Sequence, residues 1–281
     1  MRSIQIKKVV TKRLQQDFSG QQFSTAALRQ LFLPVLIDRT FLIMFGFINT
    51  ALISASGSAT IAAVNMVESL NVFLVSMISA VALAGTVLVA RDFGAGRTNK
   101  VSKVMTTSIL ITLLIGISFC LSMLLFKGPI LQGIFGSAQA EVLSISRFYF
   151  LGVLLTYPSL AILEGINGVL RGINRTKSTL SISLFTNLLY LTFSLILVIG
   201  LTQGILGLIF AMNLSRILGA IFALRLLLTS MREDGFKLSR VTQISRHQII
   251  SVIKTSIPFA SEQLFFNGGK IIMQMIVVQL G

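Results

Sequence analysis

Seven ionisable residues stand inside stretches that are otherwise apolar, and they carry most of the chemistry this sequence could perform. A carboxylate in such a setting can accept a proton or help to coordinate Na⁺. Leaving a charge against hydrocarbon costs about 2.5–3.5 kcal/mol, so these side chains should face the interior of a bundle or a wet cavity. The seven residues are Asp38, Arg39, Glu68, Glu164, Arg216, Glu262 and Lys270.

Two of the acids occupy equivalent positions of an internal repeat. Residues 33–57 align without a gap on residues 257–281, which places Asp38 opposite Glu262, each one turn after a proline. Internal repeats of this kind are typical of transporters built from two related lobes. The two acids are therefore predicted to couple ion movement to substrate movement, because an ion bound there removes charge that would hold a cationic substrate.

Structural roles remain open for each of these charges. Asp38 and Glu262 could each anchor its own helix through a neighbouring residue such as Arg39 or Arg216. Arg39 could also reach the membrane surface, since long basic side chains extend toward the headgroups. Arg216 could form an ion pair with an internal acid, and Glu164 could form one with Arg171. Glu68 could belong to a stripe of polar and small residues that packs helices together, with Asn65, Asn71, Ser69, Ser76 and Ser79.

Enzymatic chemistry has little support in the sequence. The segment Arg91–Gly96 has the glycine spacing that begins a nucleotide-binding loop, but Asn99 stands where G-x-G-x-x-G requires its third glycine. The single cysteine, Cys120, provides no disulfide or metal pair, and His247 is expected to be a surface residue. We therefore predict a protein that is not an enzyme and needs no cofactor beyond a coupling ion.

The elements that position these charges are predicted to be membrane-spanning helices. Hydrophobic residues make up 54% of the chain and charged residues only 12%, with a mean hydropathy of +0.86. A helix needs about 20 apolar residues to cross a bilayer, and an open strand cannot satisfy its backbone in lipid. Seven such spans are predicted, at residues 31–54, 61–90, 104–126, 148–170, 178–201, 204–224 and 255–280.

The repeat and the spans together predict the fold class and the domain boundaries. The expected fold is an all-α polytopic membrane protein, a six-helix transmembrane bundle followed by the first helix of a second, parallel repeat. The predicted parts are an amino-terminal tail (1–30), the first lobe (31–230), an inter-lobe linker (231–254) and the first helix of a second lobe (255–281). A complete molecule would run to about 450 residues, and this chain alone is expected not to transport, with Glu262 and Lys270 facing lipid or a partner.

The net charge of +15 is predicted to orient the helices rather than to bind nucleic acid. Outside the spans, 19 Lys and Arg residues fall on one side of the membrane, against Lys127 and Arg147 on the other. Cytoplasmic loops carry the excess of basic residues in membrane proteins. The amino terminus, the loop around Gly96 and the loop around Lys237 are therefore predicted to be cytoplasmic, and the loop around Ser137 external.

In four segments, the chain resembles the multidrug and toxic compound extrusion (MATE) family of bacterial efflux antiporters. The segments are LPVLIDRTFLIMFGFINTALIS, IAAVNMVESLNVFLVSMISAVALAGTVLVARDFGAG, VLRGINRTKSTLSISLFTNLLY and SIPFASEQLFFNGGK, in this order. The resemblance implies a cytoplasmic-membrane protein of twelve helices in two bundles, which exchanges Na⁺ or H⁺ for organic cations through a cavity between the lobes. It places Asn49 and Asn187 among the cavity residues, with Asn49 where many members have Asp.

Two other functions stay open beside cation antiport. A flippase for a lipid-linked saccharide, from the same superfamily, would favour a strongly cationic cavity. A non-catalytic membrane subunit would need no cavity chemistry. Four of the seven charges inside the spans are acidic and three are basic, so their balance favours the antiporter only weakly.

Overall fold

The structure is a computed structural model that describes residues 57–136, 138–235 and 245–280, together with eight positions between 33 and 46. Those eight positions are helical and comprise Leu33, Leu36, Ile37, Thr40, Phe41, Ile43, Met44 and Gly46. Asp38, Arg39 and Asn49 lie outside the described residues, as do the amino-terminal tail and most of the predicted linker.

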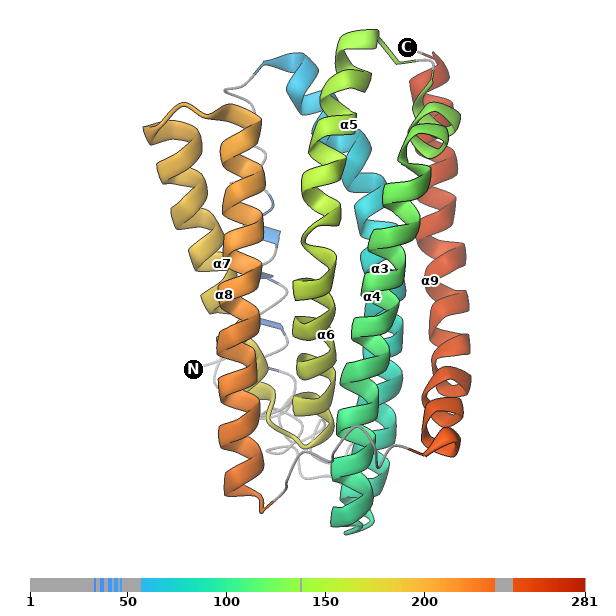
Figure 1. Cartoon of the computed structure of the whole chain (residues 1–281), viewed down its shortest axis with the longest axis vertical. Helices are drawn as coiled ribbons and strands as arrows, with labels where there is room; N and C mark the ends of the chain where they lie inside the picture. Colours follow the sequence, from blue (N-terminus) through green and yellow to red (C-terminus); the bar gives the residue numbers. More distant parts are fainter. Residues whose placement is uncertain are drawn as a thin grey trace, which may run out of the picture.

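The described part of the chain is helical throughout and contains no strand. Successive helices run up and down beside one another (Figure 1). In chain order they are α3 (Ser58–Gly94), α4 (Thr98–Phe135), α5 (Ala140–Leu154), α6 (Tyr157–Gly172), α7 (Thr176–Ser194), the π-helix η1 (Leu195–Gly200), α8 (Gly204–Glu233) and α9 (Arg246–Leu280).

The helices match the predicted spans closely where the structure describes them. α3, α4, α7 with η1, and α8 are each long and apolar enough to cross a membrane, and α5 with α6 adds a fifth candidate if the bent pair is one span. α9 coincides with the predicted span 255–280 but is less apolar, because it carries Glu262, Lys270 and several amides. The expected all-α membrane fold is confirmed, and the count of six plus one helices stays a prediction.

α5 and α6 form a broken span that is bent by 47°. The break falls at Leu155 and Thr156, directly before Pro158 in the first turn of α6. Proline has no N–H to continue the ladder of the preceding helix, so a break at this point is expected. The position of Pro158 in the first turn of α6 thus agrees with the bend.

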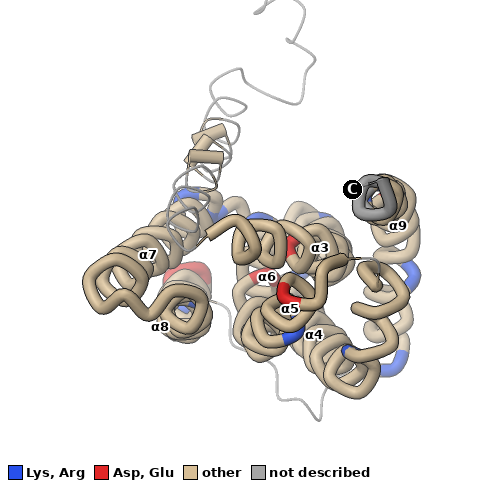
Figure 2. Tube along the Cα trace, turned by 90° about the horizontal axis from the view of Figure 1, so that it is seen from above, with Lys and Arg blue, Asp and Glu red and all other residues tan. Residues whose placement is uncertain are grey.

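α3 lies at the centre of the bundle and packs against α4, α5, α6 and α9. Viewed along the bundle, α7 and α8 lie together on one side and α3, α4, α5, α6 and α9 on the other (Figure 2). Many large apolar side chains remain exposed, among them Leu125 and Phe265, each at 78% exposure. Exposed apolar surface of this extent is expected for helices whose solvent is lipid.

Glycines on α6 allow close contact with α3. A Cβ at Gly168 would lie 2.5 Å from the carbonyl oxygen of Ala82, and one at Gly172 would lie 2.7 Å from Val89 Cγ1. Thr86 uses this proximity to donate a hydrogen bond of 2.8 Å to the Gly168 carbonyl. Two small residues four positions apart are a common device for packing helices in membranes.

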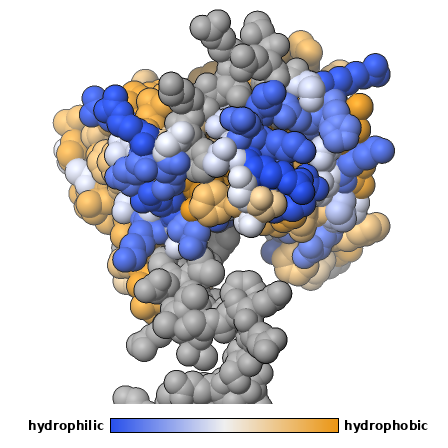
Figure 3. Space-filling view, turned by 90° about the horizontal axis from the view of Figure 1, so that it is seen from below, coloured by the Kyte–Doolittle hydropathy of each residue, from blue (hydrophilic) through white to orange (hydrophobic). Residues whose placement is uncertain are grey.

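Basic residues gather at one end of the bundle, which we call the basic face. It comprises the α3–α4 turn, the α6–α7 turn, the carboxyl end of α8 and the amino end of α9, which all lie at the lower end of Figure 1. Seen from this side, the molecule presents many hydrophilic side chains (Figure 3). Its charged members include Arg91, Arg97, Lys100, Arg171, Arg175, Lys177, Arg232 and Arg246.

Candidate functional site

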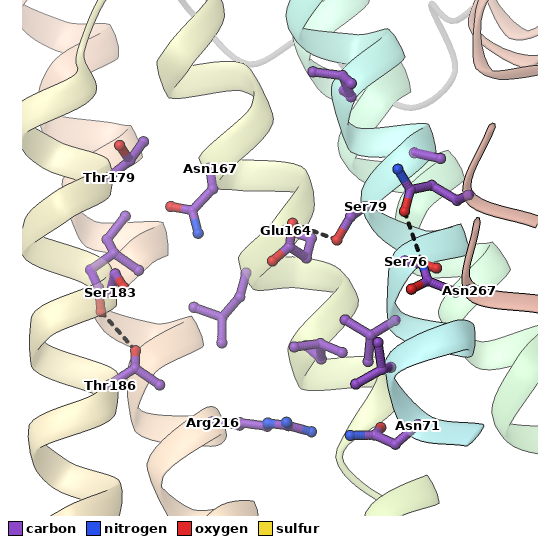
Figure 4. A pocket seen from close by; sticks show the side chains of 18 of the residues that line it. Asn71, Ser76, Ser79, Glu164, Asn167, Thr179, Ser183, Thr186, Arg216 and Asn267 are labelled. Atoms are coloured by element: carbon purple, nitrogen blue, oxygen red, sulfur yellow. Dashed lines mark hydrogen bonds between the residues drawn. The ribbon is translucent and has the colours of Figure 1, made fainter. Parts of the chain in front are cut away.

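A cavity of about 740 Å³ lies among α3, α6, α7, α8 and α9. Its apolar lining comes from residues such as Val72, Leu83 and Phe259, and polar side chains from all five helices project into it (Figure 4). The polar lining residues are Glu68, Asn71, Ser76, Ser79, Glu164, Asn167, Arg171, Thr179, Ser183, Thr186, Asn187, Arg216, Glu262, Gln263 and Asn267.

Five of the seven predicted site residues line this one cavity. They are Glu68, Glu164, Asn187, Arg216 and Glu262, which come from five different helices. The other two predicted residues, Asp38 and Asn49, lie outside the described residues, and their placement stays a prediction. Helix packing therefore brings together residues that are far apart in the sequence. The charged ones face a cavity, which avoids the free-energy cost of exposing them to lipid.

Glu68 opens onto the cavity and belongs to a short chain of hydrogen bonds. Asn71 Nδ2 donates to Glu68 Oε2 at 3.1 Å, and Tyr157 Oη donates to Asn71 Oδ1 at 3.3 Å. Tyr157 is fully buried beside the bend between α5 and α6. The stripe around Glu68 thus has a double role, because Asn71 is buried in helix packing and also lines the chamber that Glu68 faces.

Glu164 is held by a different partner from the one considered in the sequence. Ser79 Oγ on α3 donates a hydrogen bond of 3.1 Å to Glu164 Oε2. Among the described residues, no ion pair joins Glu164 to Arg171; the four ion-pair contacts present lie at the basic face, around Asp92 and Arg175. The side chains of Glu164 and Arg171 instead line the cavity separately, so a structural ion pair is wrong for this carboxylate.

Arg216 pairs with a hydroxyl instead of an acid. Its Nη1 donates a hydrogen bond to Thr156 Oγ1, at the break between α5 and α6, and no described carboxylate lies within 4 Å of it. The predicted ion pair with an internal acid is therefore not found in the part of the chain that the structure describes. The guanidinium thus connects α8 to the buried hydroxyl of Thr156 at the broken span.

α9 contributes a third carboxylate and two amides to the cavity. Glu262 and Gln263 line it one turn after Pro258, and Asn267 Nδ2 donates to Gln263 Oε1 at 2.9 Å. Glu262 was expected to face lipid or a partner in this chain, but α9 packs on α3 and turns it toward the chamber. Lys270 is exposed, with its Nζ 4.3 Å from the ring centre of Phe266 in a cation–π contact.

Several lining residues were missed in the sequence because they are uncharged. Thr179 and Ser183 precede the predicted Asn187 at spacings of four on α7, and Asn167 lies one turn after Glu164 on α6. Polar side chains that repeat at helical spacing inside an apolar span are the sequence signal that would have identified the cavity-facing side of α7. Among the described residues, no group of three His, Cys, Asp or Glu side chains could hold a metal ion.

The electrostatic character of the described cavity is mixed, with an acidic excess. Three carboxylates, Glu68, Glu164 and Glu262, and two guanidiniums, Arg171 and Arg216, line the same space. A low-dielectric chamber strengthens the interaction of these groups with a bound charge. An apolar lining with a few charged groups suits an amphipathic ion.

The fold and the cavity define a class of protein, an all-helical membrane bundle built around a charged internal chamber. A family model described as MatE matches residues 34–196, more than half of the chain. The chain therefore belongs to the MATE family, the multidrug and toxic compound extrusion proteins of the MOP superfamily.

Known proteins with similar sequences and structures extend the comparison. The chain is 21% identical over 261 residues to the uncharacterized transporter YisQ of Bacillus subtilis, covering 92% of this chain and 57% of that protein. It is 26% identical over 168 residues to the probable multidrug resistance protein NorM of Halalkalibacterium halodurans, covering 60% of this chain and 36% of that protein. The outward-facing structure of a multidrug resistance MATE family transporter matches with a TM-score of 0.79 and 18% identity, covering 85% of this chain and 52% of that one. The chain thus covers between about a third and just over half of the length of these proteins.

Proposed function

We propose that this chain forms one lobe of a secondary transporter that exports organic cations across a bacterial cytoplasmic membrane in exchange for Na⁺ or H⁺. The observation that carries the proposal is the convergence of Glu68, Glu164 and Glu262 on one partly apolar cavity. The name of the Halalkalibacterium relative, a probable multidrug resistance protein, supports an efflux role. A second lobe in the full-length protein would supply the remaining wall.

Competition for the carboxylates is the simplest basis for exchange. An organic cation is held by the negative charge of the acids and by the apolar lining. A proton or Na⁺ that binds the same acids removes that charge and releases the organic cation. We propose that Asp38 takes part in the same way, as the counterpart of Glu262 in the repeat. The roles of Asn49 and Asn187 as cavity residues are proposed on the same ground.

Binding of tetraphenylphosphonium to the 281-residue chain in lipid nanodiscs tests the proposal. Equilibrium dialysis should give saturable binding that weakens as Na⁺ or H⁺ rises, while triphenylphosphine oxide, a neutral analogue, binds weakly and without ion dependence. The combined variant Glu68→Gln, Glu164→Gln, Glu262→Gln should lose most of the cation binding. Binding that is unaffected by either ion and by the combined variant would contradict the proposal.

A lipid-linked saccharide flippase is the second candidate, because Arg171 and Arg216 line the same cavity and could pair with a diphosphate. Geranyl pyrophosphate serves as the probe in the same dialysis. If it binds more tightly than tetraphenylphosphonium and the variant Arg216→Gln abolishes that binding, the flippase is favoured over the antiporter. A membrane subunit without transport activity would bind neither probe.

A further inference from the structure

Asn167 carries a buried acceptor that the described protein leaves unused. Its side chain is only 9% exposed, it lines the cavity, and its Oδ1 has no hydrogen-bond partner. Leaving a buried acceptor unpaired costs about 1–3 kcal/mol. Such an atom in a cavity wall is a place where a bound molecule or a water recovers a hydrogen bond.

The facing helix does not supply the missing donor. Asn167 projects from α6 into the space toward α7, where Thr179 and Ser183 lie opposite (Figure 4). The hydroxyl proton of Thr179 is already donated to the Thr176 carbonyl at 2.7 Å. Ser183 Oγ accepts from Asn187 Nδ2 at 3.3 Å and makes no hydrogen bond with Asn167 Oδ1. A threonine hydroxyl has a single proton, so Thr179 cannot also serve Asn167.

Glu164 lies one turn before Asn167 and gives this acceptor a charged neighbour. Residues three apart on a helix share a face, with about 5–6 Å between their Cβ atoms. Ser79 donates to Oε2 of Glu164, and no described residue donates to Oε1. Both side chains line the same chamber, with Glu164 on the side of α3 and the oxygen of Asn167 directed toward α7 (Figure 4).

We propose that Glu164 and Asn167 form a subsite for the N–H groups of a cationic ligand, so that the chain discriminates protonated amines and guanidines from quaternary cations. The inference rests on the proposed function and adds a substrate class to it. A primary ammonium carries three N–H donors, enough for both oxygens, whereas a trimethylammonium has none. Arg171, four residues beyond Asn167 and also in the lining, repels a cation that moves further toward the basic face.

Two probes whose head groups carry either three N–H donors or three methyl groups test this subsite. 4-Phenylbutylammonium and 4-phenylbutyltrimethylammonium share one charge and one apolar body, and each is titrated into the 281-residue chain in nanodiscs by calorimetry. A hydrogen bond to a charged group contributes enough to change affinity by about tenfold or more. We expect Asn167→Leu to weaken the primary ammonium about tenfold relative to the trimethyl compound, whose Kd should change by less than about twofold.

Matched variants separate loss of the acceptor from loss of structure. Asn167→Asp keeps an acceptor oxygen and should preserve the preference for the primary ammonium, whereas Asn167→Ala, smaller than leucine, should remove it. Asn65→Leu changes an exposed amide of α3 that does not line the cavity and should leave both affinities unaltered. Elution and melting temperature confirm that each variant folds.

The outcomes also distinguish the two proposals. If wild type binds both probes and the ratio of their affinities in Asn167→Leu and Asn167→Ala is unchanged from that of wild type, the subsite is wrong and the proposed function stands. If wild type binds neither probe nor tetraphenylphosphonium, the subsite and the proposed function fail together.

Discussion

At the scale of single residues, the acids of the cavity differ in how strongly the protein holds them. Glu68 accepts from Asn71, which Tyr157 fixes in turn, so its carboxylate is part of a packed chain. Glu164 has a single donor, Ser79, and borders the unpaired oxygen of Asn167. Glu68 and Glu164 thus each have one side-chain donor, but only Glu164 has an unpaired acceptor one turn away on its own helix. The charge of Glu164 should therefore matter directly for an organic cation.

The variant Glu164→Gln should weaken tetraphenylphosphonium binding about tenfold, because it removes one charge from a low-dielectric chamber while keeping the shape of the side chain. Equilibrium dialysis in nanodiscs measures the effect. Glu141→Gln is the matched control, since Glu141 is exposed in the first turn of α5 and does not line the cavity. Equal effects of the two variants would mean that the chamber does not hold the cation.

At the scale of elements, α6 is the helix on which the cavity depends. It carries Glu164 and Asn167 on one face and presents Gly168 and Gly172 to α3. The glycines bring α3 close enough for Ser79 to reach Glu164 and for Thr86 to reach the Gly168 carbonyl. The close contact of α6 with α3 thus determines both the packing of these two helices and the hydrogen bond that holds Glu164.

Gly168→Ala should destabilise the bundle by about 1–3 kcal/mol, because the added Cβ would meet the Ala82 carbonyl oxygen at 2.5 Å and backbone cannot move aside easily. A lower melting temperature in detergent micelles is the expected readout. Gly133→Ala provides the control, because a Cβ at this exposed α4 position meets nothing within 4 Å. A melting temperature for Gly168→Ala as high as that of Gly133→Ala would contradict the proposed close contact.

A second connection between elements lies at the basic face. Arg175 in the α6–α7 turn donates from Nη2 to Asp234 Oδ1 at 2.7 Å and lies 2.8 Å from Glu233 Oε2, at the carboxyl end of α8. The hydrogen bond with Asp234 raises the pKa of Arg175 above its ordinary value. A group whose pKa is raised on folding contributes its full stabilisation at pH values below its ordinary pKa. That stabilisation is lost only as the pH rises through the raised pKa of the folded state. This contribution should therefore be constant at neutral and mildly alkaline pH.

A double-mutant cycle of Arg175→Gln and Asp234→Asn should give a coupling free energy of about 1 kcal/mol. This value lies at the upper end of the range for partly exposed ion pairs, because the contact is bidentate. Thermal unfolding of the wild type, both single variants and the double variant measures it. The coupling should shrink at high salt, since exposed charges are screened. Additive effects of the two substitutions would show that the ion pair does not stabilise the α6–α7 turn.

At the scale of the whole molecule, charge separates the two ends of the bundle. The α3–α4 turn and the α6–α7 turn share the basic face, and the α4–α5 connection lies at the opposite end (Figure 1). Membrane insertion places loops rich in Lys and Arg in the cytoplasm. The same distribution predicts a cytoplasmic amino terminus.

Single cysteines should report this orientation after Cys120 is replaced by alanine. An impermeant maleimide added to intact bacteria should label Gln139→Cys, near the α4–α5 connection, and leave Gly96→Cys, in the α3–α4 turn, unmodified. Both residues are exposed, so accessibility alone does not explain a difference. Permeabilised cells provide the control, because both positions should then react. Labelling of Gly96→Cys in intact cells would reverse the topology.

The sequence by itself determined the class of the molecule and the identity of its buried charges. Runs of apolar residues fix helices in lipid, because no other open element satisfies its backbone there, and the spans 61–90 and 104–126 fall within α3 and α4. Lipid also penalises Glu68, Glu164 and Glu262, so a bundle interior or a wet cavity could be predicted for them, but not that Glu262 would share one cavity with the others in this chain.

Only the tertiary structure decided which groups meet in that chamber. Arg216 bonds Thr156 rather than an acid, and Glu164 bonds Ser79 rather than Arg171, because the bend of α5–α6 and the glycine contact of α6 with α3 set which side chains come within reach. Hydrogen bonds act over about 3 Å, and such distances follow from helix packing rather than from spacing along the chain. The unpaired oxygen of Asn167 could be found for the same reason only after α7 was in place.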